Sequence, residues 1–216
     1  MLDAEVFRAW ITCAAEVIEA NRDHLTQLDA AIGDADHGIN LARGFAAVLD
    51  TLDGQNPGVT AAATPGRILA VTSATIISEV GGAAGPLYGM AFRCAGKSLG
   101  KATHVDPPAL AAALEAALAG VQKLGAALEG DKTMVDALAA ATRAFSKALA
   151  EGASQDDALS VLAEAASAAA IATIPMQALK GRASYLGPRS VGHEDPGAAS
   201  AALILGALRD AAWAGR

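Results

Sequence analysis

The sequence predicts a single all-α domain over residues 1–216, an up-and-down bundle or helical barrel of roughly eight antiparallel helices. The first observation is composition: 53% of the residues are hydrophobic, largely through alanine, whereas aromatic residues make up only 4%. Alanine has the highest helix propensity because ordering it costs no side-chain entropy. The second observation is that apolar residues recur at helical spacing, and the third is that short breaks separate these stretches. Short connections favour antiparallel neighbours.

Three stretches show the helical spacing most clearly, one near the N-terminus and two in the second half of the chain. Their apolar residues are Val6, Phe7, Trp10, Ile11, Ala14, Val17 and Ile18; Leu110, Leu114, Leu118, Val121 and Leu124; and Leu159, Leu162, Ala166 and Ala169. No stretch alternates apolar and polar residues for long enough to predict a strand.

Breaks rich in glycine or proline separate the expected helices at residues 33–38, 54–58, 81–89, 105–108, 130–132 and 181–197. None is long or polar enough to link two domains. The last break belongs to a long segment, residues 180–197, that contains Arg, Tyr, His and Asp. Loops of this length in compact domains are usually functional or disordered, and this mixture of side chains favours function.

Charge and hydropathy exclude several classes of protein. The net charge of −7 and pI near 5.0 argue against a nucleic-acid partner, which requires a concentrated basic face. No stretch is long and apolar enough to predict a transmembrane helix, and the N-terminus does not resemble a signal peptide. We therefore expect a soluble, cytoplasmic protein without a membrane partner. Cys13 and Cys94 lie in apolar helical patterns and are expected to be buried, reduced thiols.

A cluster of aspartates occupies the first break, which reads LDAAIGDADHGIN over residues 28–40. Asp29 is expected at the end of one helix, and Asp34 and Asp36 in the turn before the next. Converging carboxylates repel one another unless a cation lies between them, and their hard oxygens suit magnesium or calcium. The spacing is not that of an EF-hand loop. Helix capping is the alternative; it explains one aspartate well and three poorly. Spacing alone leaves both interpretations open.

Four further segments, at three of these breaks, are candidates for phosphate binding, because glycines and helix N-termini let backbone N–H groups approach an anion. They are GGAAGPLYG (81–89), GDKTM (130–134), GRAS (181–184) and HEDPGA (193–198). In the last, proline follows aspartate as in an N-capped helix with proline at its first position. If these helix starts gather at one rim of the bundle, they form a phosphate site. Close helix packing and four independent helix caps are the alternatives.

Together these motifs strongly resemble the DhaL family, the ADP-binding subunits of bacterial dihydroxyacetone kinases, from about residue 10 to residue 212. The resemblance implies a barrel of eight antiparallel helices with the nucleotide at one end. It also implies that Asp29, Asp34 and Asp36 hold two magnesium ions that bridge the phosphates of ADP or ATP. The remaining nucleotide contacts it implies are His37, Gly38, Ile39, Asn40, Ala83 and Ala84 near the phosphates, and Gly125, Met134, Arg182, Asp195, Pro196 and Gly197 near the adenine and ribose.

The implied activity is phosphoryl transfer without a covalent nucleophile on this chain. ADP stays bound, a phosphohistidine carrier (DhaM) converts it to ATP, and the γ-phosphoryl group passes to dihydroxyacetone on a DhaK subunit. One departure is Ala84, where the family commonly has a serine that can bond a phosphate oxygen. His37 is expected at the phosphate site and His193 in an ordering role, with His24 and His104 exposed.

Two alternatives remain. The first is a subunit of an ATP-dependent two-component kinase for dihydroxyacetone or another small ketose such as erythrulose. The second is a nucleotide-loaded regulatory module that docks to a transcription factor.

Overall fold

The computed structural model describes residues 1–54 and 64–214, so the predicted break at 54–58 lies mostly outside the described residues. The elements, in chain order, are β1 (Leu2–Asp3), α1 (Ala4–Ala20), α2 (Arg22–Ile32), α3 (His37–Asp53), α5 (Pro65–Glu79), α6 (Ala84–Leu99), β2 (His104–Val105), α7 (Pro107–Gly125), α8 (Met134–Ala150), α9 (Gln155–Ala172), the 3-10 helix η1 (Arg182–Ser190) and α10 (Pro196–Ala214).

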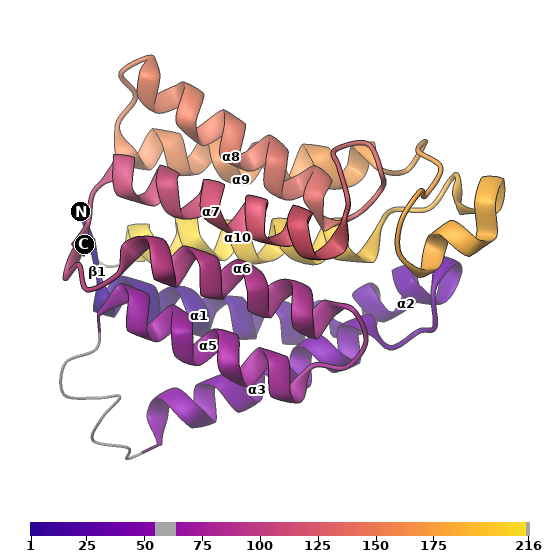
Figure 1. Cartoon of the computed structure of the whole chain (residues 1–216), viewed down its shortest axis with the longest axis horizontal. Helices are drawn as coiled ribbons and strands as arrows, with labels where there is room; N and C mark the ends of the chain where they lie inside the picture. Colours follow the sequence, from indigo (N-terminus) through magenta and orange to yellow (C-terminus); the bar gives the residue numbers. More distant parts are fainter. Residues whose placement is uncertain (55–63, 215–216) are drawn as a thin grey trace.

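Eight long helices form a closed ring in the described part of the chain. Each packs against the next in the order α1, α3, α5, α6, α7, α8, α9, α10 and back to α1. Successive helices around the ring run in alternate directions along the long axis, as the colours of Figure 1 show. The predicted all-α barrel is therefore confirmed. The short helix α2 projects beyond one end of the ring, beside η1.

A small aromatic cluster fills part of the barrel interior. The rings of Phe7 and Trp10 meet edge to face with centroids 5.7 Å apart, and Phe92 packs at 5.9 Å from Trp10 and 6.3 Å from Phe45. The indole Nε1 of Trp10 donates a 2.8 Å hydrogen bond to the carbonyl of Ile204. These contacts tie α1 to α3, α6 and α10 and satisfy the one polar atom of Trp10.

Glycines allow α5 and α6 to approach closely. A Cβ added to Gly66 would lie 2.8 Å from the carbonyl oxygen of Gly96, and one added to Gly96 would lie 2.9 Å from that of Gly66. Both distances are too short for a carbon–oxygen contact, so this helix pair depends on the absence of side chains at the two positions. Gly206 in α10 is different, because a Cβ there would meet nothing within 4 Å.

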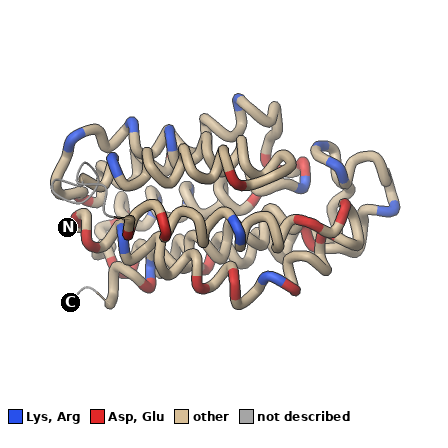
Figure 2. Tube along the Cα trace, turned by 90° about the horizontal axis from the view of Figure 1, so that it is seen from below, with Lys and Arg blue, Asp and Glu red and all other residues tan. Residues whose placement is uncertain are grey.

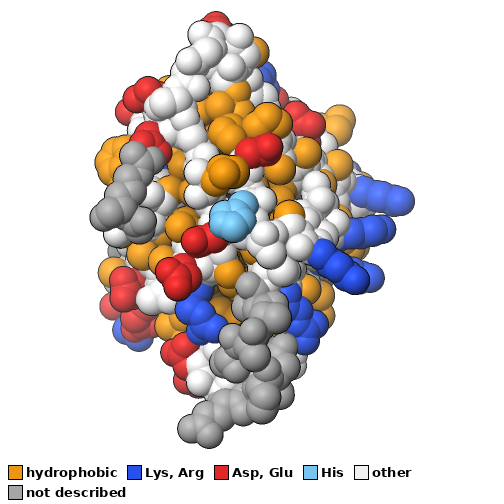
Figure 3. Space-filling view, turned by 90° about the vertical axis from the view of Figure 1, so that its left-hand side faces the viewer, with side chains coloured by type: hydrophobic (Ala, Val, Ile, Leu, Met, Phe, Trp, Pro, Cys, Tyr) orange, Lys and Arg blue, Asp and Glu red, His pale blue; other side chains and the backbone are white. Residues whose placement is uncertain are grey.

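The strands β1 and β2 pair antiparallel, with Leu2 opposite Val105 and Asp3 opposite His104. The sequence did not predict them, because two residues per strand are too few to produce an alternating pattern. They lie at the end of the barrel where both termini are found (Figure 1). Figure 3 looks onto this end, where hydrophobic and charged side chains are intermixed.

The surface charge and the hydropathy of the described helices agree with what the sequence predicted. Acidic and basic residues of both signs are spread along the helices (Figure 2). Among the described helices, none has the length and apolarity that crossing a membrane requires. Cys13 and Cys94 are free thiols, but both are only half-buried, so the expectation of full burial was wrong.

Candidate functional site

A pocket of about 180 Å³ opens at the end of the barrel opposite the termini. Its walls come from five separate segments: the α2–α3 turn, the turn before α6, the loop before α8, the entrance to η1 and the start of α10. The lining residues are Asp29, Ile32, Asp34, Asp36, His37, Asn40, Gly81, Gly82, Ala83, Ala84, Leu87, Tyr88, Lys132, Thr133, Met134, Lys180, Gly181, Arg182, Ala183, Asp195, Pro196 and Gly197. The aspartate turn and the four predicted glycine-bearing segments thus meet at one pocket.

Three carboxylates converge at the pocket's edge. Oxygen atoms of Asp29, Asp34 and Asp36 all lie within 4.8 Å of one another. Asp29 extends from the last turn of α2, which ends at Ile32, and the chain then turns back through Ala35. Ala35 has a φ of 63°, in the left-handed region that alanine rarely adopts. This unfavourable conformation brings the two later aspartates back toward Asp29, and such strain often marks a functional turn.

The hydrogen bonds at the start of α3 show which of the three aspartates caps this helix. Asp36 occupies the N-cap position of α3, but its side chain makes no capping hydrogen bond. Instead, Oδ2 of Asp29 accepts the backbone N–H groups of Asp36 at 2.9 Å and His37 at 3.2 Å. One aspartate therefore performs the capping, and the carboxylate of Asp36 remains available.

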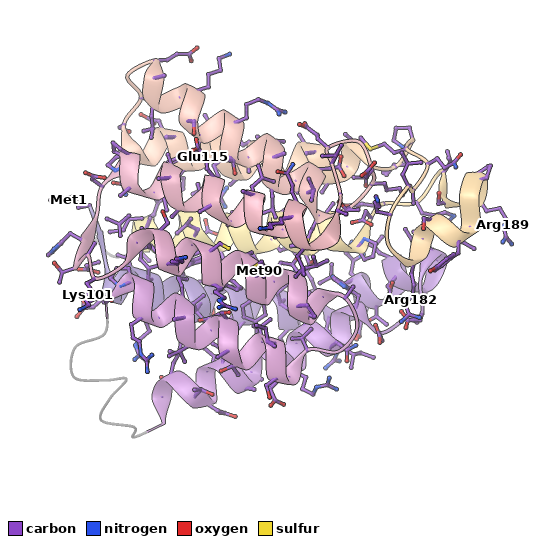
Figure 4. All side chains as sticks on the ribbon, viewed as in Figure 1. Met1, Met90, Lys101, Glu115, Arg182 and Arg189 are labelled. Carbon is purple, nitrogen blue, oxygen red and sulfur yellow. The ribbon has the colours of Figure 1, made fainter. Side chains whose placement is uncertain are left out.

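The third carboxylate, Asp34, pairs with Arg182 through a 3.0 Å ion pair. Arg182 lies beside α2 at the start of η1, whereas Arg189 at the far end of η1 points away from the barrel (Figure 4). One guanidinium leaves a net negative charge on three carboxylates. Carboxylate oxygens are the donors that Mg²⁺ prefers, and its remaining positions are usually filled by water and phosphate. The residues present fit magnesium.

His37 connects this cluster to the barrel. Its Nε2 lies 2.8 Å from the Ser200 hydroxyl, which lies 2.6 Å from the Tyr88 hydroxyl. Burial lowers the pKa of His37, and the negative charges of Asp29 and Asp36 oppose that shift. Burial also raises the pKa of Tyr88 above its usual range. The three side chains form a hydrogen-bonded link from α3 through α10 to α6.

Asp195 caps α10 from inside the molecule. Its Oδ2 accepts the N–H of Ala198 at 2.7 Å, and Pro196 takes the first helical position, the arrangement expected from HEDPGA. Burial raises the pKa of Asp195 to about 7, and the nearby charge of Asp136 adds to the increase. The Ala198 hydrogen bond and the charge of Lys132 act in the opposite direction.

Most, but not all, of the predicted nucleotide residues line the pocket. Those that do are His37, Asn40, Ala83, Ala84, Met134, Arg182, Asp195, Pro196 and Gly197. Gly38 instead faces α2, where a Cβ would collide with the Arg22 carbonyl, and Ile39 is half-exposed on the outside of α3. Gly125 lies behind Leu87, which itself lines the pocket. Direct contact of these three residues with a nucleotide stays a prediction.

Other lining residues were not predicted as site residues. Tyr88 and Lys132 belong to motifs that the sequence indicated, GGAAGPLYG and GDKTM, but their roles depend on partners distant in sequence. His24, His104 and His193 have exposed side chains. His193 nonetheless contributes its backbone carbonyl as an acceptor for Lys132.

The fold and the site together define a class of protein: an all-α barrel with a pocket edged by carboxylates at one end. Residues 31–210 match the family model described as the DAK2 domain. The chain belongs to this family. Among its curated relatives, the ADP-binding subunit DhaL of the PEP-dependent dihydroxyacetone kinase of Escherichia coli K12 is 39% identical over 203 residues, or 94% of both chains. DhaL of the PTS-dependent dihydroxyacetone kinase of Lactococcus lactis is 38% identical over 208 residues, covering 96% of this chain and 97% of the relative.

Solved structures of a dihydroxyacetone kinase also resemble this chain in fold. The dihydroxyacetone kinase of C. freundii in complex with AMP-PNP and Mg²⁺ matches with a TM-score of 0.71 and 27% identity, over 97% of this chain and 34% of the kinase. Its native form matches with a TM-score of 0.72 and 25% identity. This chain therefore corresponds to about a third of that longer kinase.

Proposed function

We propose that this chain is the nucleotide-binding phosphotransfer subunit of a dihydroxyacetone kinase. In this proposal it holds ADP or ATP with two magnesium ions and passes the γ-phosphoryl group to dihydroxyacetone on a DhaK-like partner. A DhaM-like phosphohistidine carrier then converts the bound ADP back to ATP. The observation that carries the proposal is the convergence of Asp29, Asp34 and Asp36 beside a pocket where several helices begin.

The residues of the pocket divide the work of holding a nucleotide. Asp29, Asp34 and Asp36 would hold the magnesium, which neutralises phosphate charge when bound. The helix α6 begins at Ala84 without a capping side chain, so its first N–H groups remain available to phosphate oxygens. Met134 and the start of α10 supply the opposite wall of the pocket. The chain thus positions phosphates and offsets their charge, and the chemistry requires no nucleophile from it.

The surroundings of the pocket support a protein partner. Tyr185 on η1 is 88% exposed, and Leu179 and Val191, which flank η1, are also exposed. Exposed apolar and aromatic side chains beside a binding site are typical of docking surfaces. A partner that docks here would bring its own substrate to the mouth of the nucleotide pocket.

Ala84 favours one alternative. It stands at the first residue of α6, where a serine hydroxyl could add a hydrogen bond to phosphate, and its absence weakens retention of the nucleotide. A lost hydrogen bond of this kind costs about 1–3 kcal/mol when the site is desolvated. The alternative is an ATP-dependent two-component kinase, for dihydroxyacetone or another small ketose, that exchanges free nucleotide at each turnover.

Reconstitution separates these possibilities. The purified chain is mixed with a DhaK-type subunit, Mg²⁺ and dihydroxyacetone, and formation of the phosphorylated ketose is followed with either ATP or a phosphorylated carrier as donor. Turnover with the carrier at catalytic ADP supports the bound-coenzyme scheme, and turnover only with excess ATP supports the exchanging kinase. No ketose phosphate with either donor, from a chain that binds Mg–ADP, would contradict both.

A further inference from the structure

Lys132 is the most deeply buried cation in the described part of the chain, with 0% of its surface exposed. Its backbone φ is 61°, in the left-handed region, at the end of the loop before α8. This conformation directs the side chain inward. Burying an ammonium group costs free energy unless polar partners surround it, so the neighbours of Lys132 must compensate for its burial.

Four backbone carbonyls surround the ammonium. Its Nζ lies 3.0 Å from the oxygen of Thr173, 3.1 Å from that of Met176 and 2.8 Å from that of Ser190, and it also bonds the oxygen of His193. An ammonium has three N–H groups, so all of them are used by this set of acceptors. We call these four oxygens the carbonyl cage. Lys132 lines the pocket but has no proton left for a phosphate.

The carbonyl cage is distributed along one continuous segment, residues 173–193, which contains η1. The segment makes further bonds of the same kind: Leu179 N–H donates to the Asp131 carbonyl at 3.0 Å, and Gly192 N–H to the Ile174 carbonyl at 2.8 Å. Arg182 lies within this segment, and Asp195 follows it and donates its N–H to the Thr173 hydroxyl at 2.9 Å. One cation thus crosslinks the whole segment to the loop before α8.

The middle of the crosslinked segment and the residues that follow it both reach the candidate site. Arg182 pairs with Asp34, and Asp195 to Gly197 line the opposite side of the pocket. Without the ammonium, four inward-facing carbonyls would lose their donor, and the segment could recover solvation only by opening toward water. Opening would move Arg182 and the start of α10 together.

We propose that Lys132 is a positioning residue for nucleotide binding, acting as a tethered cation that holds residues 173–193 in place, so that residues 180–183 line the pocket. This inference rests on the proposed nucleotide site and assigns to the lysine of GDKTM a role through the carbonyl cage rather than through phosphate. Lys132 and the four carbonyls of the cage all lie outside the barrel helices, so we expect the effect of its loss to be local.

The test compares Lys132→Ala and Lys132→Met with a control, Lys147→Ala, which removes an exposed lysine of α8. Mg–ADP affinity is measured by calorimetry, and amide hydrogen exchange is measured without nucleotide. We expect both Lys132 variants to bind Mg–ADP about tenfold or more weakly, which corresponds to about 1.4 kcal/mol. We also expect faster exchange at residues 173–195 and unchanged exchange in α1, α5 and α6.

Chemical rescue identifies the tethered cation. Lys132→Ala leaves a space for propylammonium, which carries the missing atoms, so this amine is expected to restore exchange protection and Mg–ADP affinity, whereas tetramethylammonium, which has no N–H, restores neither. Wild-type affinity in the Lys132 variants, a uniform rise in exchange across the barrel, or failure of propylammonium to rescue would overturn the proposal. If the wild type itself binds no Mg–ADP, the proposed function fails, and the exchange and rescue measurements still decide the role of Lys132.

Discussion

Asp29 frees its neighbours by taking over their capping role. Oδ2 of Asp29 accepts the first N–H groups of α3, so the carboxylate of Asp36 is not used for capping. Among the described residues, Asp34 forms an ion pair with Arg182. Gly33 packs directly against Asp29, and a Cβ at this position would collide with its carboxylate. The glycine in LDAAIGDADHG therefore serves the geometry of the aspartates as well as the turn.

We predict that Asp34→Ala abolishes the stabilisation of the chain by Mg–ADP. Ligand at about 100 times its Kd stabilises a protein by about 2.7 kcal/mol, which a thermal melt detects readily. Asp53→Ala is the matched control, because Asp53 is an exposed aspartate at the other end of α3, paired with Arg8. An Asp34→Ala variant that kept the full Mg–ADP shift in Tm would contradict the metal assignment.

Asp195 is expected to make the stability of the folded chain depend on pH. Its pKa rises from 3.8 to about 7 in the folded state, so the folded chain binds this proton more tightly than the unfolded chain. Stability contributed at this site is therefore present at low pH and is lost as the pH rises toward 7. Asp195→Asn keeps an oxygen for the Ala198 N–H but carries no charge. We predict that its stability relative to wild type increases between pH 5 and pH 8 in urea titrations, while a pH-independent difference would show that Asp195 titrates normally.

For single residues, the sequence predicted which residue types and motifs would form the candidate site, but not which distant residues they would contact. The aspartates, His37 and the HEDPGA cap lie where local pattern indicated, because their geometry is set within one turn. The role of Lys132 could not be predicted, since its acceptors are 41 to 61 residues away along the chain. The resemblance implied nucleotide contacts for Gly38 and Ile39 as well as for His37 and Asn40. Because a helix turns successive residues to different sides, Gly38 and Ile39 do not line the pocket.

Among the elements, the α5–α6 pair is held by contact between backbones. This close approach is possible because Gly66 and Gly96 lack side chains at the crossing. The resulting wall carries the turn of residues 81–84 to the pocket. The crossing itself lies near the start of α5 and the end of α6, at the end of the pair away from that turn.

We predict that Gly66→Ala destabilises the chain by about 1–3 kcal/mol, because its methyl group would overlap backbone of α6. Gly206→Ala is the matched substitution in α10, where a methyl group meets nothing within 4 Å. It is expected to stabilise the chain by up to about 1 kcal/mol through helix propensity. Urea unfolding of both variants checks this, and equal effects would show that the crossing tolerates a side chain.

The sequence predicted most of the long helices because their apolar residues recur at helical spacing and most of their boundaries contain glycine or proline. Besides the two short strands, the sequence did not indicate the α8–α9 connection at residues 151–154, the α1–α2 boundary or the helix η1. The boundary between α1 and α2 falls at Asn21 without glycine or proline, so the pattern reads through it. The helix η1 lies in a segment predicted as a loop, since its 3-10 turns contain Gly187 and Pro188 and have no long apolar stripe.

For the whole molecule, alternation of helix direction collects the starts of α3, α6, α8 and α10 at one end and both termini at the other. A barrel built in this way concentrates helix N-termini, and hence partial positive charge, around the pocket. Four of the five motifs that carry the resemblance directly precede these helices, so they come together at this end.

We predict that the chain purifies with bound adenine nucleotide when magnesium is present throughout. Acid extraction followed by chromatography measures the amount, and a chelator wash is the control that should remove it. Stoichiometric ADP supports the coenzyme scheme. A nucleotide-free preparation that still binds added Mg–ADP would favour the exchanging kinase.

The two tryptophans give the molecule an intrinsic optical readout. Trp10 is enclosed by Phe7 and Phe92 inside the barrel, whereas Trp213, beneath Arg209, is 49% exposed in the last turn of α10, away from the pocket. Emission from Trp10 should shift to longer wavelength only when the barrel itself opens, and Trp213 should already emit as a solvated indole. Neither lines the pocket. Fluorescence will therefore record global unfolding but not loosening of residues 173–193, so a variant can keep its native spectrum while the pocket at the far end of the barrel has opened.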